Sequence, residues 1–247
     1  TNGSATNAGD YTATVTPTSN YKWSKDNTTT AKTVSWSIAK FNLQNASIAA
    51  VADQTYTGSA ITPTPAVTVV LKTGGTSTTL SSSTDFSFSY ANNTNVGTAT
   101  LTITGKGNYT GTKSSSFNIV KLGVAKPTAK TNLTYTGSSQ TGVTFVSGAG
   151  YSLQSGGATS GINAGSYTAT FVLDGNHKWS DNTTANVTIT WKISPKSVAV
   201  SWTNTSFTYN GTSHAPTASV ASGITGETIN LTVSGAQTNA SANNYTA

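Results

Sequence analysis

The sequence predicts an all-β protein made of tandem small β-sandwich domains, arranged as beads in an elongated rod or fibre. Three observations lead to this prediction. Apolar residues alternate with Thr or Ser over short stretches, a set of motifs recurs along the chain, and the composition is poor in the residues that form helices.

The composition favours a folded β protein over a disordered chain. Thr and Ser together fill about a third of the 247 residues, and only 8% are charged. The five Trp and ten Tyr nevertheless need a core to pack against. Cys is absent, which excludes a disulfide framework and thiolate metal sites.

Strands are expected where apolar and hydroxyl residues alternate, with the apolar face turned inward. Thr suits the outer face because its β-branch favours an extended backbone. The alternation places Trp36 and Trp191 in the core. Clear examples lie at 86–90, 100–104 and 187–193. Tight turns with a left-handed Gly are expected at Gly58, Gly137 and Gly211.

Four landmarks recur in fixed order with a period of about 75 to 80 residues, the size of a small sandwich domain. The first is an aromatic turn, Tyr-Thr-Gly-Ser or a close variant, at 56–59, 135–138 and 209–212. The second is Asn-Ala-Gly-x-Tyr-Thr-Ala-Thr at 7–14 and 163–170, with a looser copy at 95–100. The third, Asn-aromatic-Lys-Trp-Ser, stands at 20–24 and 176–180, with a looser copy at 107–111. A closing aromatic strand ends in Lys at 36–40, 117–121 and 191–196.

These landmarks predict four segments. Residues 1–40 are expected to be the C-terminal part of a preceding repeat, and residues 197–247 the N-terminal part of a following one. Residues 41–121 and 122–196 are expected to be complete repeats. Two readings of the partial repeats stay open: they are completed by a neighbouring copy of the chain, or they are cut from one longer chain. A duplicated Asn…Tyr-Thr-Ala strand, at 7–13 and 239–247, favours the second reading.

At these landmarks the chain resembles the bacterial immunoglobulin-like tandem repeats of the MBG type, found in large cell-surface and adhesin-like proteins. The resemblance spans essentially the whole chain. It implies an immunoglobulin-like sandwich for each repeat, and a location that is extracellular, either on the bacterial cell surface or secreted. The repeat at 41–121 departs from the pattern, with Ala99, Tyr109-Thr110-Gly111 and Phe117 in place of Tyr, Lys-Trp-Ser and Trp.

The function predicted is a non-catalytic extracellular stalk, spacer or fibre-forming segment. Two alternatives stay open: an adhesive module that binds a glycan or a host protein through hairpin Trp residues, and an accessory region of a large secreted enzyme. No enzyme activity, cofactor or metal is expected. The seven carboxylates and two His are spread over several repeats and form no recurring set.

Two sets of residues are candidate sites. Tyr21, Trp23, His177 and Trp179 form the first set. An aromatic residue in a hairpin either stacks on a ligand or covers the end of the core, and covering the core is favoured. Lys40, Lys121 and Lys196 are candidates for the isopeptide crosslinks that the resemblance suggests. The alternative for them is a solvated Lys whose stem covers the joint between repeats.

The partners expected are neighbouring repeats of the same chain, other copies in a fibre, and a glycan or host surface protein. Nucleic acid is not expected, because the net charge of +6 comes from scattered Lys with no Arg. No membrane span is expected in this stretch, because no apolar run approaches the roughly 18 residues required.

Overall fold

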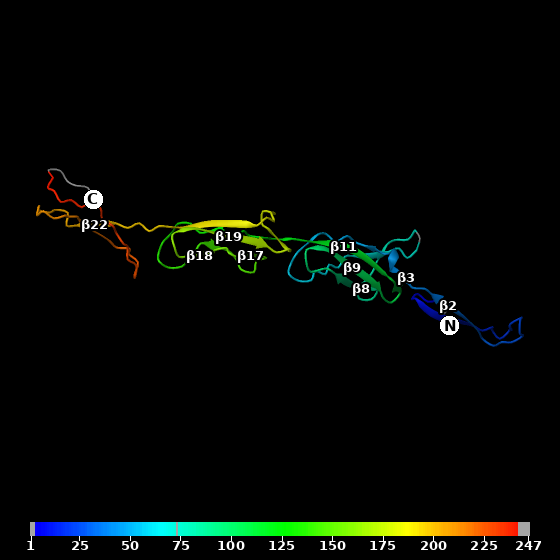
Figure 1. The fold of residues 1–247 in the computed structure, drawn as a ribbon. Helices are drawn as coiled ribbons and strands as arrows, with labels where there is room; N and C mark the ends of the chain where they lie inside the picture. Colours follow the sequence, from blue (N-terminus) through cyan, green and yellow to red (C-terminus); the bar gives the residue numbers. More distant parts are fainter. Residues whose placement is uncertain (1–2, 73, 242–247) are drawn as a thin grey trace. The chain divides into compact units, whose positions relative to one another are not determined.

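The regular structure of the described residues is almost entirely β-strand, which confirms the predicted all-β class (Figure 1). The computed structural model describes residues 3–72 and 74–241. In these residues the only helix is one 3₁₀ turn, Leu43–Asn45, which begins with the Asn42 side chain accepting from the Gln44 N–H. The outer ends of the two predicted partial repeats, residues 1–2 and 242–247, lie outside the described residues.

The chain separates into two compact units, each described here by itself. Unit 1 comprises the residues up to Gly123 together with Gly175–Asn182, and unit 2 comprises Val124–Asp174 and the residues from Thr183 onward. The predicted repeat boundaries at 40/41, 121/122 and 196/197 stay predictions.

The strands of unit 1 are β1 (Gly9–Val15), β2 (Lys32–Ile38), β3 (Phe41–Asn42), β4 (Ser47–Ile48), β5 (Gln54–Thr55), β6 (Val67–Val69), β7 (Thr78–Thr79), β8 (Phe86–Ala91), β9 (Gly97–Gly105), β10 (Tyr109–Thr110), β11 (Thr112–Val120), β12 (Leu122–Val124, which ends in unit 2) and β20 (His177–Trp179). The strands of unit 2 are β13 (Thr128–Ala129), β14 (Leu133–Thr134), β15 (Gln140–Thr141), β16 (Val143–Thr144), β17 (Tyr151–Leu153), β18 (Ser160–Gly161), β19 (Gly165–Leu173), β21 (Val187–Ser194), β22 (Val200–Thr203) and β23 (Thr217–Val220).

Two sheets of unit 1 share one core. A four-stranded sheet has the order β5-β11-β9-β8, and a three-stranded sheet has the order β4-β6-β7. Buried side chains from both sheets and from the 3₁₀ turn form a single cluster, which includes Leu43, Val67, Phe86, Leu101 and Phe117. The long strands β9 and β11 run side by side in Figure 1.

The alternation seen in the sequence becomes the two faces of these strands. In β9 the side chains of Ala99, Leu101 and Ile103 are buried, while the Thr residues between them are not. β8, β9 and β21 cover the three predicted alternating stretches, so those predictions are confirmed. Successive side chains of a strand point to opposite faces of the sheet. Because Thr alternates with the buried apolar residues, it occupies the outer face.

Unit 2 repeats the long sheet with the order β14-β21-β19-β17. Here Tyr167 of β19 stands opposite Trp191 of β21, and the two rings stack with centroids 4.4 Å apart. Trp191 is buried and its Nε1–H donates to the Ala158 carbonyl at 2.8 Å, which confirms its predicted core position. The described residues of this unit also form three small sheets, β13-β16, β15-β18 and β22-β23.

The pair β1-β2 in unit 1 has the same register as the central pair of unit 2. Tyr11 stands opposite Trp36, with ring centroids 5.0 Å apart. Trp36, however, is only half-buried, so its predicted core position is wrong in this structure. In the described part of the chain, β1 and β2 pair only with each other, as a two-stranded sheet.

The three aromatic turns have the expected geometry. Gly58, Gly137 and Gly211 have φ values of +80°, +76° and +80°, in the region that favours Gly over other residues. The three turn predictions are therefore confirmed.

Candidate interaction site

One Asn side chain joins two distant segments of unit 1 in an arrangement that we call the paired-Asn clamp. The amide Oδ1 of Asn108 accepts the Ala8 N–H at 2.8 Å, and its Nδ2 donates to the Asn7 Oδ1 at 3.1 Å. The backbone of the same residue is held as well, because its carbonyl accepts the Phe41 N–H at 3.0 Å. Asn108 therefore ties the start of β1 to the start of β3.

The next residue, Tyr109, anchors this clamp in the core. It is buried, pairs with Phe41 in a parallel bridge, and meets the Phe41 ring edge-on at a centroid distance of 6.3 Å. Burial raises the pKa of the Tyr109 hydroxyl, and the charge of Asp85 raises it further. An apolar anchor thus stands beside the polar clamp.

A second paired-Asn clamp, at Asn176, has the same atoms in the same roles. Its Oδ1 accepts the Val96 N–H at 2.9 Å, and its Nδ2 donates to the Asn95 Oδ1 at 3.1 Å. Its carbonyl accepts the Leu122 N–H at 3.1 Å. Asn176 belongs to unit 1, although β19 and β21 on either side of it in sequence belong to unit 2.

Sequence reasoning named these Asn residues as landmarks and assigned them no role. A signal was present: the Asn of the Asn-x-Gly motif and the hairpin Asn stand thirteen positions apart in all three copies, at 7 and 20, 95 and 108, and 163 and 176. What the spacing does not reveal is that Asn108 and Asn176 bind the Asn-x-Gly motif of the preceding copy rather than their own.

Two predicted site residues lie beside the second clamp and are buried. Trp179 has 0% of its surface exposed, and His177 meets the Tyr56 ring edge-on at a centroid distance of 5.3 Å. An indole that is fully enclosed has no free face for stacking on a ligand. These positions therefore fit the reading in which the hairpin aromatics cover the end of a core.

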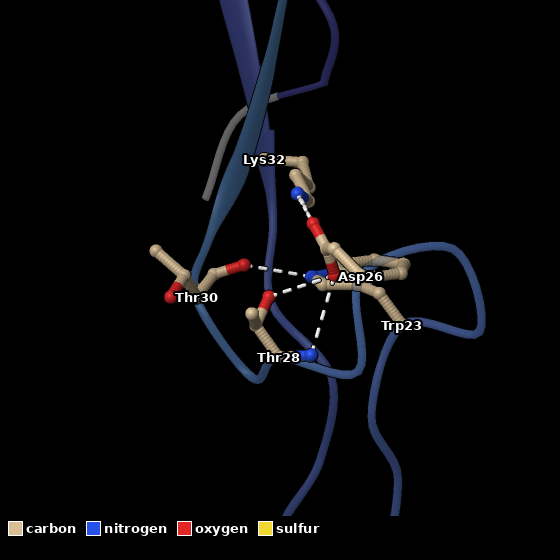
Figure 2. Close-up of polar contacts among 5 residues, drawn as sticks. All are labelled: Trp23, Asp26, Thr28, Thr30 and Lys32. Atoms are coloured by element: carbon tan, nitrogen blue, oxygen red, sulfur yellow. Dashed lines mark hydrogen bonds and ion pairs between the residues drawn. The ribbon is translucent and has the colours of Figure 1, made fainter.

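The other two predicted site residues are accessible. Tyr21 exposes 71% of its surface and Trp23 is half-buried. The Trp23 Nε1–H donates to the Thr30 carbonyl at 2.7 Å, which fixes the ring across its own hairpin (Figure 2). Ligand contact through Tyr21 and Trp23 stays a prediction.

Asp26 organises the same hairpin, as Figure 2 shows. Its carboxylate accepts from Lys32 Nζ, from the Thr28 Oγ1 at 2.9 Å and from the Thr28 N–H at 3.2 Å. The Lys32 ammonium and the Thr28 donors hold the pKa of Asp26 below its usual value.

The lowered pKa of Asp26 predicts a pH dependence of the hairpin. The charged carboxylate stabilises the folded hairpin above about pH 4, and this contribution is lost as the pH falls through the folded pKa. Asp26→Asn should therefore loosen the hairpin at pH 7 and have little effect below that pKa. Amide hydrogen exchange of residues 23–32 at both pH values would measure this. Lys32→Gln should raise the Asp26 pKa, and an unchanged titration of Asp26 in that variant would contradict the assignment.

The three candidate crosslinking lysines have different surroundings. Lys40 is exposed, and Lys196 Nζ donates to the Gly223 carbonyl at 3.0 Å. Lys121 lines a groove of about 440 Å³ together with Lys178 and Asn118, whose Nδ2 donates to Asp53 at 3.2 Å. Isopeptide bonds at these lysines stay a prediction.

A second groove lies at the aromatic turn of unit 2. It has a volume of about 640 Å³ and is lined by Tyr135, Ser138, Lys196 and Ile224 among others. The Tyr135 hydroxyl donates to the Glu227 carboxylate, and this bond raises the pKa of Tyr135. The turn thus contacts a later segment of the chain, as Tyr56 does with His177 in unit 1.

A search for metal-binding side chains covers the described part of the chain, which includes both grooves. In residues 3–72 and 74–241 no three His, Cys, Asp or Glu side chains come together as metal ligands. The same residues contain no helix long and apolar enough to cross a membrane. The repeated geometry that the described chain does present is the paired-Asn clamp.

One comparison with known proteins gives a match, and it lies within the predicted central repeat. The family model of the MBG domain matches residues 43–108, within the predicted repeat 41–121. Comparison with curated proteins and with solved structures gives no match. MBG is a family of structural repeat domains rather than of enzymes, and its presence indicates a repeat region of a surface protein. The match over residues 43–108 confirms the prediction of MBG-type repeats.

Proposed function

We propose that this chain is a non-catalytic, extracellular stalk or spacer segment of a bacterial surface protein, in which MBG-type sandwich repeats follow one another as beads in a rod. The observation that carries the proposal is the paired-Asn clamp, which occurs twice with the same donors and acceptors. A device repeated at successive positions serves the arrangement of the repeats rather than a single ligand.

The clamp is suited to holding one repeat at a fixed angle to the next. Its side-chain amide donates one hydrogen bond to the neighbouring segment and accepts another from it. The pair of bonds fixes the orientation of the two segments as well as the distance between them. A backbone bond and a buried aromatic residue stand next to it in both copies. The joints Lys40-Phe41 and Lys121-Leu122 contain no flexible Gly/Ser spacer. A semi-rigid rod is the expected result.

A distance measurement between two labels tests the proposal. The chain has no Cys, so Ser116→Cys and Thr190→Cys place one spin label in each predicted complete repeat, at exposed positions. We expect a narrow distance distribution in this labelled chain. Adding Asn176→Asp should broaden it, because a carboxylate oxygen then faces the Asn95 Oδ1 in place of a donor.

The control for this measurement is Asn230→Asp, an exposed Asn outside both clamps that should leave the distribution unchanged. Small-angle scattering of the same chain should give a radius of gyration well above the roughly 18 Å of a compact protein of this length. A broad label distribution in the chain without clamp substitutions would contradict the proposed stalk.

Adhesion is a second candidate function, favoured by the exposure of Tyr21 next to Trp23. An aromatic face in solvent is a usual platform for a sugar ring or a protein partner. Binding to a glycan-coated surface that is lost in Tyr21→Ser would support it. In the remaining alternative, an accessory region of a large secreted enzyme, the repeats would act as a spacer in the same way. That role requires no binding site in this chain.

A further inference from the structure

In residues 3–72 and 74–241, Asn is the only residue besides Gly that has a positive φ. Five Asn do so, with φ between +53° and +68°. All five are exposed and stand in turns or loops outside the strands. They are Asn27, Asn92, Asn132, Asn182 and Asn204. Asn tolerates the left-handed conformation better than most residues, so the backbone of these turns accounts for the choice of Asn.

The backbone does not account for a second feature that the five Asn share. Two positions after each of them stands an exposed hydroxyl residue. These residues are Thr29, Thr94, Thr134, Thr184 and Ser206. Of the fourteen other Asn in the described residues, six have Ser or Thr at that position. A left-handed turn depends on the Asn itself, so the hydroxyl residue indicates a use of the motif other than forming the turn.

Two of the five, Asn92 and Asn182, show how the turns are held within the repeats predicted to be complete. Asn92 lies between β8 and β9. The next residue, Asn93, donates from its Nδ2 to the Ile61 carbonyl at 3.0 Å, and its own carbonyl accepts the Ile61 N–H at 2.8 Å. Asn182 closes the turn after β20 by donating its N–H to the Trp179 carbonyl at 2.8 Å. The fold thus fixes the backbone of each turn and leaves the Asn at the surface.

Asn108 has the same sequence motif, but the structure already uses its side chain. The motif there is Asn108-Tyr109-Thr110. The Asn108 Oδ1 accepts the Ala8 N–H, and its Nδ2 donates to the Asn7 Oδ1. A group attached to Nδ2 would crowd the bond to Asn7. The paired-Asn clamp and a modification of Asn108 would therefore compete for the same nitrogen.

We propose that Asn92, Asn132 and Asn182 are acceptor sites for N-linked sugars. An Asn followed at the second position by Ser or Thr is the acceptor motif for this modification, and an acceptor must stand in an exposed turn for a transferase to enclose its amide. Asn27 and Asn204 belong to the same class. The proposal goes beyond the stalk function and gives the repeats a covalent sugar coat. Such a coat would hydrate a chain in which only 8% of the residues are charged.

The transfer needs an activated sugar as its co-reactant. The donor is a sugar whose anomeric carbon carries a phosphate leaving group, linked either to a nucleotide or to a lipid. The Asn Nδ2 forms a bond to the anomeric carbon, and the bond from that carbon to the phosphate oxygen breaks. The leaving group takes the electron pair, and one proton of the Asn amide passes to a base of the transferase.

Peptide mass mapping of the protein isolated from the cells that produce it tests the proposal. Trypsin cuts after Lys106, so it separates the peptide that carries Asn92 from the short peptide 107–113 that carries Asn108. We expect the mass of whole sugars on the peptides of Asn92, Asn132 and Asn182, and none on peptide 107–113. One hexose per site would indicate a nucleotide-linked donor. A block of several sugars would indicate a lipid-linked one.

Substitution of the hydroxyl residues separates the modification from the turn. In the same cells, Thr94→Val and Thr134→Val should each lose the sugar at their own site, whereas Thr94→Ser and Thr134→Ser should keep it. Both Thr are exposed, so the circular dichroism of the Val variants should stay unchanged.

Unmodified peptides at all three sites, or a sugar on Asn108 as frequent as on Asn92, would overturn the proposal. So would a sugar that remains in the Val variants. These outcomes are distinct from failure of the stalk. The label distances between repeats are measured on the chain without sugars, and they would stay narrow in a rod that is never modified.

Discussion

Replacing Trp179 by Ala is expected to lower the free energy of unfolding by about 3–5 kcal/mol, the usual cost of removing a fully buried large aromatic side chain. Trp179 has no exposed surface and sits in the hairpin that carries the clamp residue Asn176. The cavity left behind should also loosen that clamp. Urea unfolding followed by circular dichroism measures the stability, and hydrogen exchange of the Val96 N–H reports the clamp.

Trp23→Ala is the matched control, because Trp23 stands at the same motif position as Trp179. Trp23 is half-buried, and the hydrogen bond of its side chain goes to the Thr30 carbonyl. We expect a loss of about 1 kcal/mol, the usual contribution of a single hydrogen bond. Equal losses in the two variants would show that the burial of Trp179 contributes nothing to stability.

Gly142→Ala is expected to destabilise unit 2 by about 3 kcal/mol, at the upper end of the cost of overpacking. A Cβ on Gly142 would lie 2.0 Å from ring atoms of Trp191. The ring has no room to retreat, since it stacks on Tyr167 and donates to the Ala158 carbonyl. Thermal unfolding should show a lower midpoint together with altered near-ultraviolet ellipticity of Trp191.

Gly175→Ala is the control for this substitution. No atom lies within 4 Å of the position that its Cβ would take. Its effect should stay within about 0.5 kcal/mol, as for ordinary surface substitutions. If Gly175→Ala lowered the stability as much as Gly142→Ala, the destabilisation would come from replacing Gly by Ala in itself and not from the clash with Trp191.

The strands could be predicted because the alternating pattern that defines them involves only neighbouring residues. An alternating stretch such as Val187–Ser194 has one apolar face whatever surrounds it, and the structure turns that face inward at Trp191 and Ile193. The turn glycines are equally local, since a positive φ depends on the residue itself.

The candidate site was predicted only in part, because clamps join residues far apart in sequence. Asn176 meets Asn95, and Asn108 meets Asn7, so each contact depends on which segments the fold brings together. Trp23 and Trp179 share the motif Lys-Trp-Ser but differ in burial. The motif encodes the hairpin, and the difference comes from what packs against it.

The sequence by itself determined the all-β class, the period of the repeats, the positions of the main strands and the kinship with MBG domains. Alternation and turn chemistry depend on residues a few positions apart, and the period is visible from motifs that recur along the chain, so no tertiary information is needed to recognise them. Only the tertiary structure decided which aromatic residues are enclosed, and that hairpin asparagines bind the preceding copy of the motif. Burial and side-chain pairing depend on contacts between distant segments, and these exist only once the chain has folded.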